Sequence, residues 1–249
     1  MSAIQKGFEI LKVVTAAADG LSFSEIVSST GVAKASAHRL LKELVELKAL
    51  TQNPATRRYQ GGLLLAQLGA AVTADYDLRR IARPHLKALH DETGQVATLG
   101  IRNDDVGTYI DKIEARDFGL RLHSEIGKSF PLHCTAMGKV MLSHADSATI
   151  RRLTNRKLES YTENTITEGR QLRKMLKQII ANGYAVDREE ITRGLICIAA
   201  PVFGVDGEIA GAMSCTFPSY IFDKKGMDNE IESVVRHAKA ISGSAVNSP

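Results

Sequence analysis

Polar and basic side chains are concentrated in a short segment near the N-terminus. Between residues 34 and 42 they occupy one side of a helical spacing, and apolar residues occupy the other side. Hydroxyl, imidazole and guanidinium groups can bond to base edges in a DNA groove, and ammonium groups can contact phosphates. This segment is therefore a candidate nucleic-acid contact, made of Lys34, Ser36, His38, Arg39 and Lys42.

A second group of residues has the types and spacing to hold a small ligand. Thr135 begins an expected helix, so the amides of Ala136 and Met137 are free donors at the positive end of the helix dipole, which suits a carboxylate. Ser214 and Thr216 are two positions apart in an expected strand and therefore share one face. Two hydroxyls on one sheet face can bond a small polar molecule. These five residues form a candidate ligand site.

The charge distribution separates these two groups. The chain of 249 residues has 32 basic and 28 acidic residues, a net charge of +4. Residues 1–60 hold eight basic and five acidic residues, whereas residues 61–249 are nearly neutral. A compact basic segment beside a nearly neutral remainder suggests a small nucleic-acid-binding module joined to another domain. A solvated basic surface is the alternative.

The N-terminal residues predict three helices. Apolar residues spaced i, i+4 and i+7 predict a helix over residues 3–17. Ser22 and Glu25 have the spacing of a capping box at the start of a second helix, which Gly31 ends. A third helix follows three residues later, and its apolar face opposes the polar one. That buried face consists of Ala37, Leu40, Leu41 and Leu44.

A short hairpin completes this domain. Residues 49–51 and 58–60 predict two strands around the loop 53–56, with Arg57 and Arg58 placed to reach the DNA backbone or the minor groove. Helix, Gly-containing turn, helix and hairpin together predict a winged helix-turn-helix; a helical-bundle fragment with a basic surface is the alternative. The predicted DNA-binding residues are Ser22, Ser24, Lys34, Ser36, Ala37, His38, Arg39, Lys42, Arg57 and Arg58.

The remaining chain predicts an α+β domain. An apolar stripe over residues 63–72 indicates a linker helix that is either core or a dimer contact, so domains are expected at 1–74 and 75–249. Helices are expected at 77–92, with Pro84 interrupting or kinking the helix, and at 135–144, 146–154, 168–181 and 227–241. Strands are expected at 95–101, 106–114, 120–123, 184–189, 195–203 and 208–217. Hairpins of this kind predict an antiparallel sheet flanked by helices.

Composition argues against several classes of protein. No run approaches the ~18–20 apolar residues of a membrane span, and the N-terminus has no apolar signal-peptide core, so no membrane partner is expected. Cys134, Cys197 and Cys215 form no CxxC pair, which favours the reducing cytoplasm. His133, Cys134 and Asp187 resemble a catalytic set, but adjacent strand residues point to opposite faces, so no catalytic residue is expected. A metal at His123 and His133 has no ligand spacing to support it, and no cofactor is expected.

Several ordered stretches resemble the IclR family of bacterial transcriptional regulators over nearly the whole chain. They are LSFSEIVSSTGVAKASAHRLLKELVELKAL, RRYQGG, LRRIARPHLKALHDETG, FPLHCTAMGKVML, GYAVDREE and GLICIAAPVFGVDGEIAGAMS. Ala35 and Ala37 depart from the usual hydroxyl and β-branched residues, and residues 191–193 are atypical. The resemblance implies a winged-helix domain, a linker helix and a GAF-like effector domain with a six-stranded antiparallel sheet.

The resemblance also implies a function. Family members hold small organic acids at the positions matching Ala136, Met137, Asp187, Cys197, Ser214 and Thr216. Asp187 would accept from a ligand hydroxyl or be protonated. The expected protein is a ligand-responsive repressor of a catabolic operon that senses a sugar acid or keto acid. It would bind double-stranded operator DNA as a homodimer or homotetramer; the alternative is a DNA-binding dimer without an effector, and a metal-binding or enzymatic second domain is less favoured.

Overall fold

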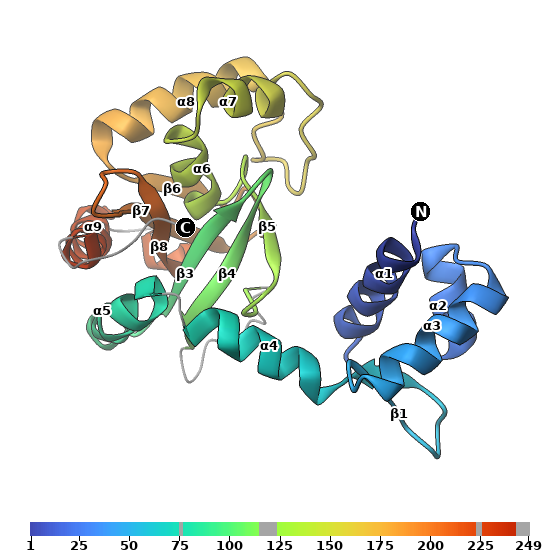
Figure 1. Cartoon of the computed structure of the whole chain (residues 1–249). Helices are drawn as coiled ribbons and strands as arrows, with labels where there is room; N and C mark the ends of the chain where they lie inside the picture. Colours follow the sequence, from blue (N-terminus) through green and yellow to red (C-terminus); the bar gives the residue numbers. More distant parts are fainter. Residues whose placement is uncertain (75–76, 115–123, 223–225, 243–249) are drawn as a thin grey trace. The chain divides into compact units, whose positions relative to one another are not determined.

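The computed structural model describes residues 1–74, 77–114, 124–222 and 226–242 (Figure 1). The chain forms two compact units, Met1–Asp75 and Tyr76–Pro249, which places the boundary one residue beyond the expected one. Across the described ranges, the helices are too short or too polar to cross a membrane. Each unit is considered separately below.

The first unit contains the three expected helices and the hairpin. They are α1 (Ala3–Ala16), α2 (Phe23–Thr30), α3 (Lys34–Glu46), β1 (Leu50–Gln52), β2 (Tyr59–Gly61) and then α4 (Leu63–Ala74). Ser22 and Glu25 form the predicted capping box at the start of α2. Gly31 ends α2 with a left-handed φ of 65°, a conformation that glycine adopts without steric cost.

A small core holds this unit together. It combines Ile10 and Val14 of α1 with Ile26 of α2, Leu41 of α3 and Leu50 of β1. The predicted stripe on α1 is therefore only partly correct, since Ile4 and Phe8 remain exposed. Both hairpin strands lie one residue later than expected, around a turn that Asn53 organises. Its side chain accepts from the amides of residues 55 and 56, and its carbonyl accepts from the residue 57 amide.

The second unit is a six-stranded antiparallel sheet with helices on both faces, so the predicted α+β class is confirmed. The strand order is β5-β4-β3-β8-β7-β6. The strands are β3 (Val96–Asn103), β4 (Val106–Ile113), β5 (Ser129–Pro131), β6 (Ala185–Arg188), β7 (Leu195–Phe203) and β8 (Ile209–Pro218). The helices are α5 (Asp77–Thr93), α6 (Ala136–Ser143), α7 (Ser147–Thr154), α8 (Gly169–Asn182) and α9 (Asp228–Ser242), with a 3-10 turn over Ser219–Phe222.

Each face of the sheet has its own hydrophobic core, and helices cover both faces (Figure 1). Helices α5 and α9 cover one face, on which Met213, Cys215 and Phe217 of β8 are buried. Helix α6 covers the other face, with α7 and α8 packed beyond it. Because strand residues alternate, Ser214 and Thr216 lie on the α6 side, as their spacing predicted.

Two expectations differ from the structure at least in part, and a third falls outside it. Helix α5 continues through Pro84, so Pro84 does not interrupt it, and the alternative of a kink stays a prediction. Strand β5 was missed because it has only three residues and ends in proline, which offers little periodicity. The strand expected at residues 120–123 lies outside the described residues.

Gly62, between the hairpin and α4, allows its backbone to lie close to the backbone of Lys48. A Cβ on Gly62 would clash with the Lys48 carbonyl, whereas a Cβ on Gly69 of α4 would meet no atom within 4 Å. We expect Gly62→Ala to destabilise the first unit by about 1–3 kcal/mol because backbone must move. Gly69→Ala is the matched control and should be neutral or stabilise by up to about 1 kcal/mol.

Thermal unfolding followed by circular dichroism checks this pair of variants. A loss of 1 kcal/mol lowers the Tm of a domain of this size by roughly 4–8 °C. Equal melting of Gly62→Ala and the wild type would contradict the close approach.

Candidate functional site

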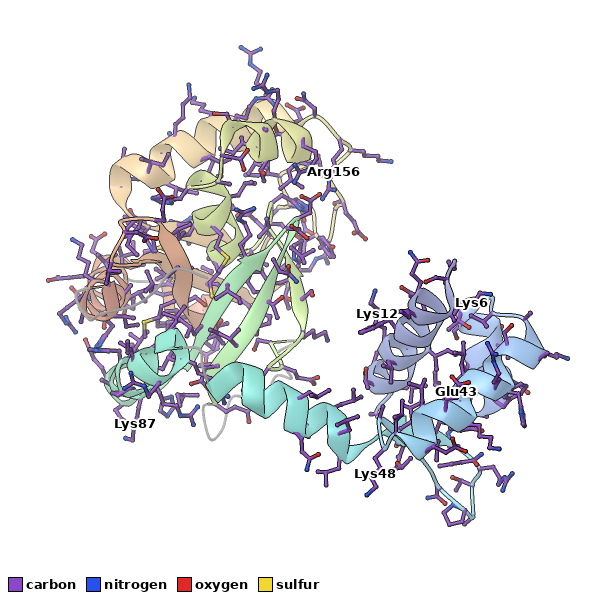
Figure 2. All side chains as sticks on the ribbon, in the orientation of Figure 1. Lys6, Lys12, Glu43, Lys48, Lys87 and Arg156 are labelled. Atoms are coloured by element: carbon purple, nitrogen blue, oxygen red, sulfur yellow. The ribbon has the colours of Figure 1, made fainter. Side chains whose placement is uncertain are left out.

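Helix α3 presents a polar face to solvent. Lys34, His38, Arg39 and Lys42 are exposed and Ser36 is half-buried. Arg39 lies 3.8 Å from Glu43, whose side chain projects from α3 in Figure 2. An exposed ion pair at this distance contributes little stability. The Arg39 guanidinium is therefore free to exchange this carboxylate for another acceptor.

The prediction that Ala37 contacts DNA is wrong. Its side chain is 0% exposed and packs in the interior of the first unit. Ala37 lies on the apolar side of α3, although Ser36 and His38, its neighbours in sequence, belong to the polar face. A helix places successive residues about 100° apart, so a DNA-contacting face cannot include every residue of a segment.

The two arginines of the hairpin differ in their surroundings. Arg57 is exposed and has a left-handed φ of 58°. Arg58 donates to the Gly20 carbonyl at 2.9 Å and lies 3.1 Å from a Glu25 carboxylate oxygen. Its guanidinium therefore ties the hairpin to the turn before α2, which contradicts the expectation that it reaches DNA.

The two serines of α2 also differ. The Ser22 hydroxyl accepts from the Glu25 amide, and the Ser22 amide donates to the Glu25 carboxylate at 2.7 Å. This second bond, with contributions from the Ser22 hydroxyl and Arg58, holds the pKa of Glu25 below its usual value. Ser22 is thus part of the helix cap. Ser24 is exposed and available to another molecule.

The second unit contains a cavity of about 350 Å³ on the α6 side of the sheet. Three of the residues predicted to bind an effector line this cavity: Thr135, Cys197 and Thr216. Cys197 and Thr216 are direct cross-strand partners on β7 and β8, and their Sγ and Oγ1 atoms are 3.2 Å apart. A wider hollow of about 700 Å³ between α8 and β6 contains none of the predicted ligand residues.

Four other predicted ligand residues do not line this cavity. Ala136 and Met137 are buried in the α6 core. The Ser214 hydroxyl bonds to the Thr98 hydroxyl at 2.7 Å. Asp187 accepts from the Glu190 amide at 2.7 Å. We refer to these four residues as the layer behind the cavity wall, because its lining does not include them.

Most of the cavity wall comes from residues that sequence reasoning missed. Two tyrosines, a phenylalanine and a lysine are the most distinctive among them. They come from β4, from the segment around β5 and from two loops that meet only in the folded unit. The missed residues are Tyr109, Ser124, Lys128, Ser129, Phe130, Pro131, Tyr161, Ile191, Thr192 and Leu195.

Two loops form the outer wall and are bonded to each other. The Thr162 hydroxyl donates to the Glu189 carbonyl at 2.6 Å, and the Thr165 hydroxyl donates to the Glu190 carbonyl at 2.6 Å. The loop between α7 and α8, which carries Tyr161, is thereby joined to the segment between β6 and β7. No single stretch of sequence shows this arrangement.

A buried charge network lies behind the cavity. Lys139 of α6 is fully buried, donates to the Val186 carbonyl at 2.8 Å and pairs with Glu190. Burial raises the pKa of Asp187 to about 7, while the Lys139 charge opposes this shift. This shift favours the protonated form of Asp187, one of the two states that its expected role allowed.

The thiols near the cavity are not activated. Burial raises the pKa of Cys134 and of Cys197, so both remain thiols at neutral pH. His133 Nε2 lies 2.8 Å from the Glu159 carbonyl and its pKa is lowered by burial. Among the described residues, no three His, Cys, Asp or Glu side chains form a group suited to a metal ion.

Comparison with known proteins agrees with this organisation. Residues 3–54 match the IclR helix-turn-helix domain, and residues 70–243 match the C-terminal domain of the bacterial transcriptional regulator IclR. The HTH-type transcriptional regulator BhcR of Paracoccus denitrificans (strain Pd 1222) is 31% identical over 96% of this chain and 86% of its own. The HTH-type transcriptional regulator XynR of Escherichia coli (strain K12) is 30% identical over 97% of this chain and 96% of its own.

Solved structures show the same fold. The crystal structure of an IclR transcriptional regulator from Alicyclobacillus acidocaldarius has a TM-score of 0.85 and 27% identity over 97% of both chains. The IclR of Thermotoga maritima has a TM-score of 0.76 and 28% identity over 96% of this chain and 97% of its own. The protein is therefore a member of the IclR family of DNA-binding transcriptional regulators rather than an enzyme.

Proposed function

We propose that this regulator is a repressor of catabolic genes and that a ring-sized carboxylic acid is its effector. The observation that supports the effector is the cavity, in which hydroxyl groups, aromatic rings and one lysine lie together. We place the protein and its effector in the cytoplasm, because unpaired cysteines favour this reducing compartment.

The DNA contact is assigned to the exposed start of α3. In a helix-turn-helix, the N-terminal residues of the second helix enter the major groove and meet base edges. Lys34, Ser36, His38 and Arg39 lie in the first two turns of α3. Lys42, Arg57 and Ser24 are assigned to phosphates, because they are exposed and lie outside this start.

The size of the cavity restricts the effector. A water molecule occupies about 30 Å³ of liquid, so a volume of about 350 Å³ corresponds to roughly a dozen waters. A keto acid of five or six non-hydrogen atoms would leave about half of this space to water. A sugar acid or hydroxybenzoate with about ten to twelve non-hydrogen atoms fills it better. An IclR homologue of Microbacterium hydrocarbonoxydans has been crystallised with 4-hydroxybenzoate.

The chemistry of the wall is consistent with such an acid. Lys128 offers a positive charge for the carboxylate, and Thr216 and Thr192 offer hydroxyls for its other oxygens. Tyr109 and Tyr161 offer ring faces against which a sugar or aromatic ring packs. The layer behind, which includes Asp187 and Ser214, holds this wall in position through hydrogen bonds.

Exposed apolar side chains on the first unit suggest a second copy of the chain as a partner. Ile4 and Phe8 on α1 are 73% and 61% exposed, and Leu63 and Leu68 on α4 are 67% and 55% exposed. Large apolar groups repeated on exposed helices are typical of an interface. A dimer, or a dimer of dimers, would place two α3 helices on half-sites about 34 Å apart or a multiple of that.

A thermal-shift screen with galacturonate, 4-hydroxybenzoate and pyruvate tests the effector. Binding to the folded state stabilises a protein by about 2.7 kcal/mol at a hundredfold excess over Kd. We expect one of the two ring-sized acids to raise the Tm of the second unit and pyruvate to raise it less. The absence of any shift would favour a DNA-binding dimer without an effector.

Two hydroxyl variants place that effector in the cavity. Thr216→Val should weaken binding of the stabilising acid by about 0.5–1.5 kcal/mol, the value of a neutral hydrogen bond. Ser214→Ala is the matched control, since its hydroxyl bonds to Thr98 and does not line the cavity. Isothermal titration measures both. Equal effects of the two variants would contradict the assigned wall.

Arg39 tests the DNA-reading face. Replacing it with Ala should cost on the order of 1–3 kcal/mol on the operator if it binds a guanine with two hydrogen bonds. Affinities for the operator and for random DNA, measured by fluorescence anisotropy, decide the role. An equal loss on both DNAs would make Arg39 a phosphate contact.

The hairpin arginines are expected to behave differently. Arg57→Ala should flatten the dependence of log K on log salt by about 0.9, the value for one phosphate contact. Arg58→Ala should leave the slope unchanged, because its guanidinium is bonded to Gly20 and Glu25. A salt titration of DNA binding measures both slopes, and flattening by Arg58→Ala would mean that Arg58 leaves its internal partners.

A further inference from the structure

Strand β4 contains a bulge that directs two side chains, two positions apart, to opposite faces of the sheet. Leu99 pairs with Asp111 and Gly100 pairs with Tyr109, so Ile110 is an extra residue opposite β3. Residues two apart in a regular strand share a face. In β4 the extra residue lies between Tyr109 and Asp111, so these two side chains point to opposite faces. Tyr109 consequently lines the cavity on the α6 side, and Asp111 meets α5 on the other side.

Asp111 attaches β4 to α5. The side chain is 0% exposed, and its Oδ1 accepts from Arg83 and, at 2.9 Å, from the Lys112 amide. Arg79 Nε lies 3.9 Å from Oδ2. A buried carboxylate is costly without its cationic partners. A displacement of β4 at this point therefore requires Arg83 and Arg79 to follow.

Tyr109 is held at the cavity both by its ring and by its backbone. The ring packs on Phe130 with centroids 4.5 Å apart. The Tyr109 amide donates to the Lys128 carbonyl at 3.1 Å, and its carbonyl accepts from Gly127 at 2.7 Å. Gly107 has no space for a Cβ beneath Phe130. Because this region is closely packed, a ligand that moves the ring also moves the strand.

Helix α5 is the first element of the second unit along the chain. It begins at Asp77, and only residues 75 and 76 separate it from the end of α4. Arg79 and Arg83 lie in its first two turns. Its apolar side chains Leu78, Leu86 and Leu89 are buried in the core of the second unit. On its other side, Lys87 projects away from the sheet in Figure 2. The start of α5 is thus attached to β4 through the pairing of Arg79 and Arg83 with Asp111.

We propose that occupancy of the cavity is transmitted to the DNA-binding unit through the β4 bulge, with Asp111 as the positioning residue that couples Tyr109 to the start of α5. This proposal rests on the proposed function, since it assigns a regulatory role to the wall of the same cavity. Coupling of this kind requires two discrete arrangements of one element that both sites bias. The bulge is the proposed element, because its Tyr109 side chain lines the cavity and its Asp111 side chain pairs with α5.

The test is a double-mutant cycle on DNA affinity that needs no effector. The DNA is an operator selected from a random library with the wild-type protein. Tyr109→Leu changes the side chain through which the bulge lines the cavity. Arg83→Gln removes an α5 partner of Asp111 and leaves the residues of β4 unchanged. We expect Tyr109→Leu to change the operator Kd by about fivefold or more, the usual lower range for allosteric coupling. In the Arg83→Gln background, Tyr109→Leu should change the operator Kd by less than about twofold.

Glu92→Gln provides the matched control. Glu92 attaches the other end of α5 to α9 through Arg236 at 2.6 Å, so its loss removes an ion pair of α5 away from the bulge. The effect of Tyr109→Leu should persist in this background. Asp111→Asn should reproduce Arg83→Gln, and circular dichroism melts confirm that each variant is folded.

The outcomes separate this proposal from the effector assignment. Independent effects of Tyr109→Leu and Arg83→Gln, or no effect of Tyr109→Leu, would overturn the coupling even if an acid binds the cavity. Loss of the Tyr109→Leu effect by Glu92→Gln would also overturn it, because the route would then not be specific to Asp111. Coupling in the cycle supports the route even if every acid in the screen fails to bind.

Discussion

The register between β7 and β8 is the constraint on which the second unit depends. Cys197 lies opposite Thr216, and Ile198 lies opposite Cys215. This pairing directs Thr216 and Cys197 to the cavity and Cys215 to the core under α5 and α9. A slip of one residue would exchange the two sets and bury hydroxyls in an apolar core. The cavity and that core are thus two consequences of one register.

Local sequence features predict the elements because their causes are local. The Ser22–Glu25 capping box, the glycine after α2 and the alternation in β8 each involve residues within a few positions of one another. The faces of α3 follow from the same logic, although Ala37 belongs to the buried one. Family resemblance added Cys197, which no spacing argument had selected.

The unpredicted features come from contacts between distant residues. Arg58 meets Gly20 from 38 positions away, so its inward bonds could not be inferred from its position in the hairpin. Ser214 lies on the predicted strand and face, but its hydroxyl forms a hydrogen bond with the hydroxyl of Thr98 on β3. The bulge at Ile110 has no marker such as glycine in β4 itself at that point. A regular alternation through β4 would place Tyr109 and Asp111 on one face, and only the register with β3 shows that they lie on opposite faces.

The buried polar groups explain why the cavity wall has a defined shape. Lys139, Glu190 and Asp187 lie within an otherwise apolar layer, and Glu190 retains one buried oxygen without a hydrogen bond in the described residues. Such groups are costly to bury, and replacing them with apolar ones is often stabilising. What they contribute here is position, because Lys139 joins α6 to the segment that supplies Ile191 and Thr192. A wall made only of loops would allow many shapes, whereas directional bonds from a helix restrict it to one.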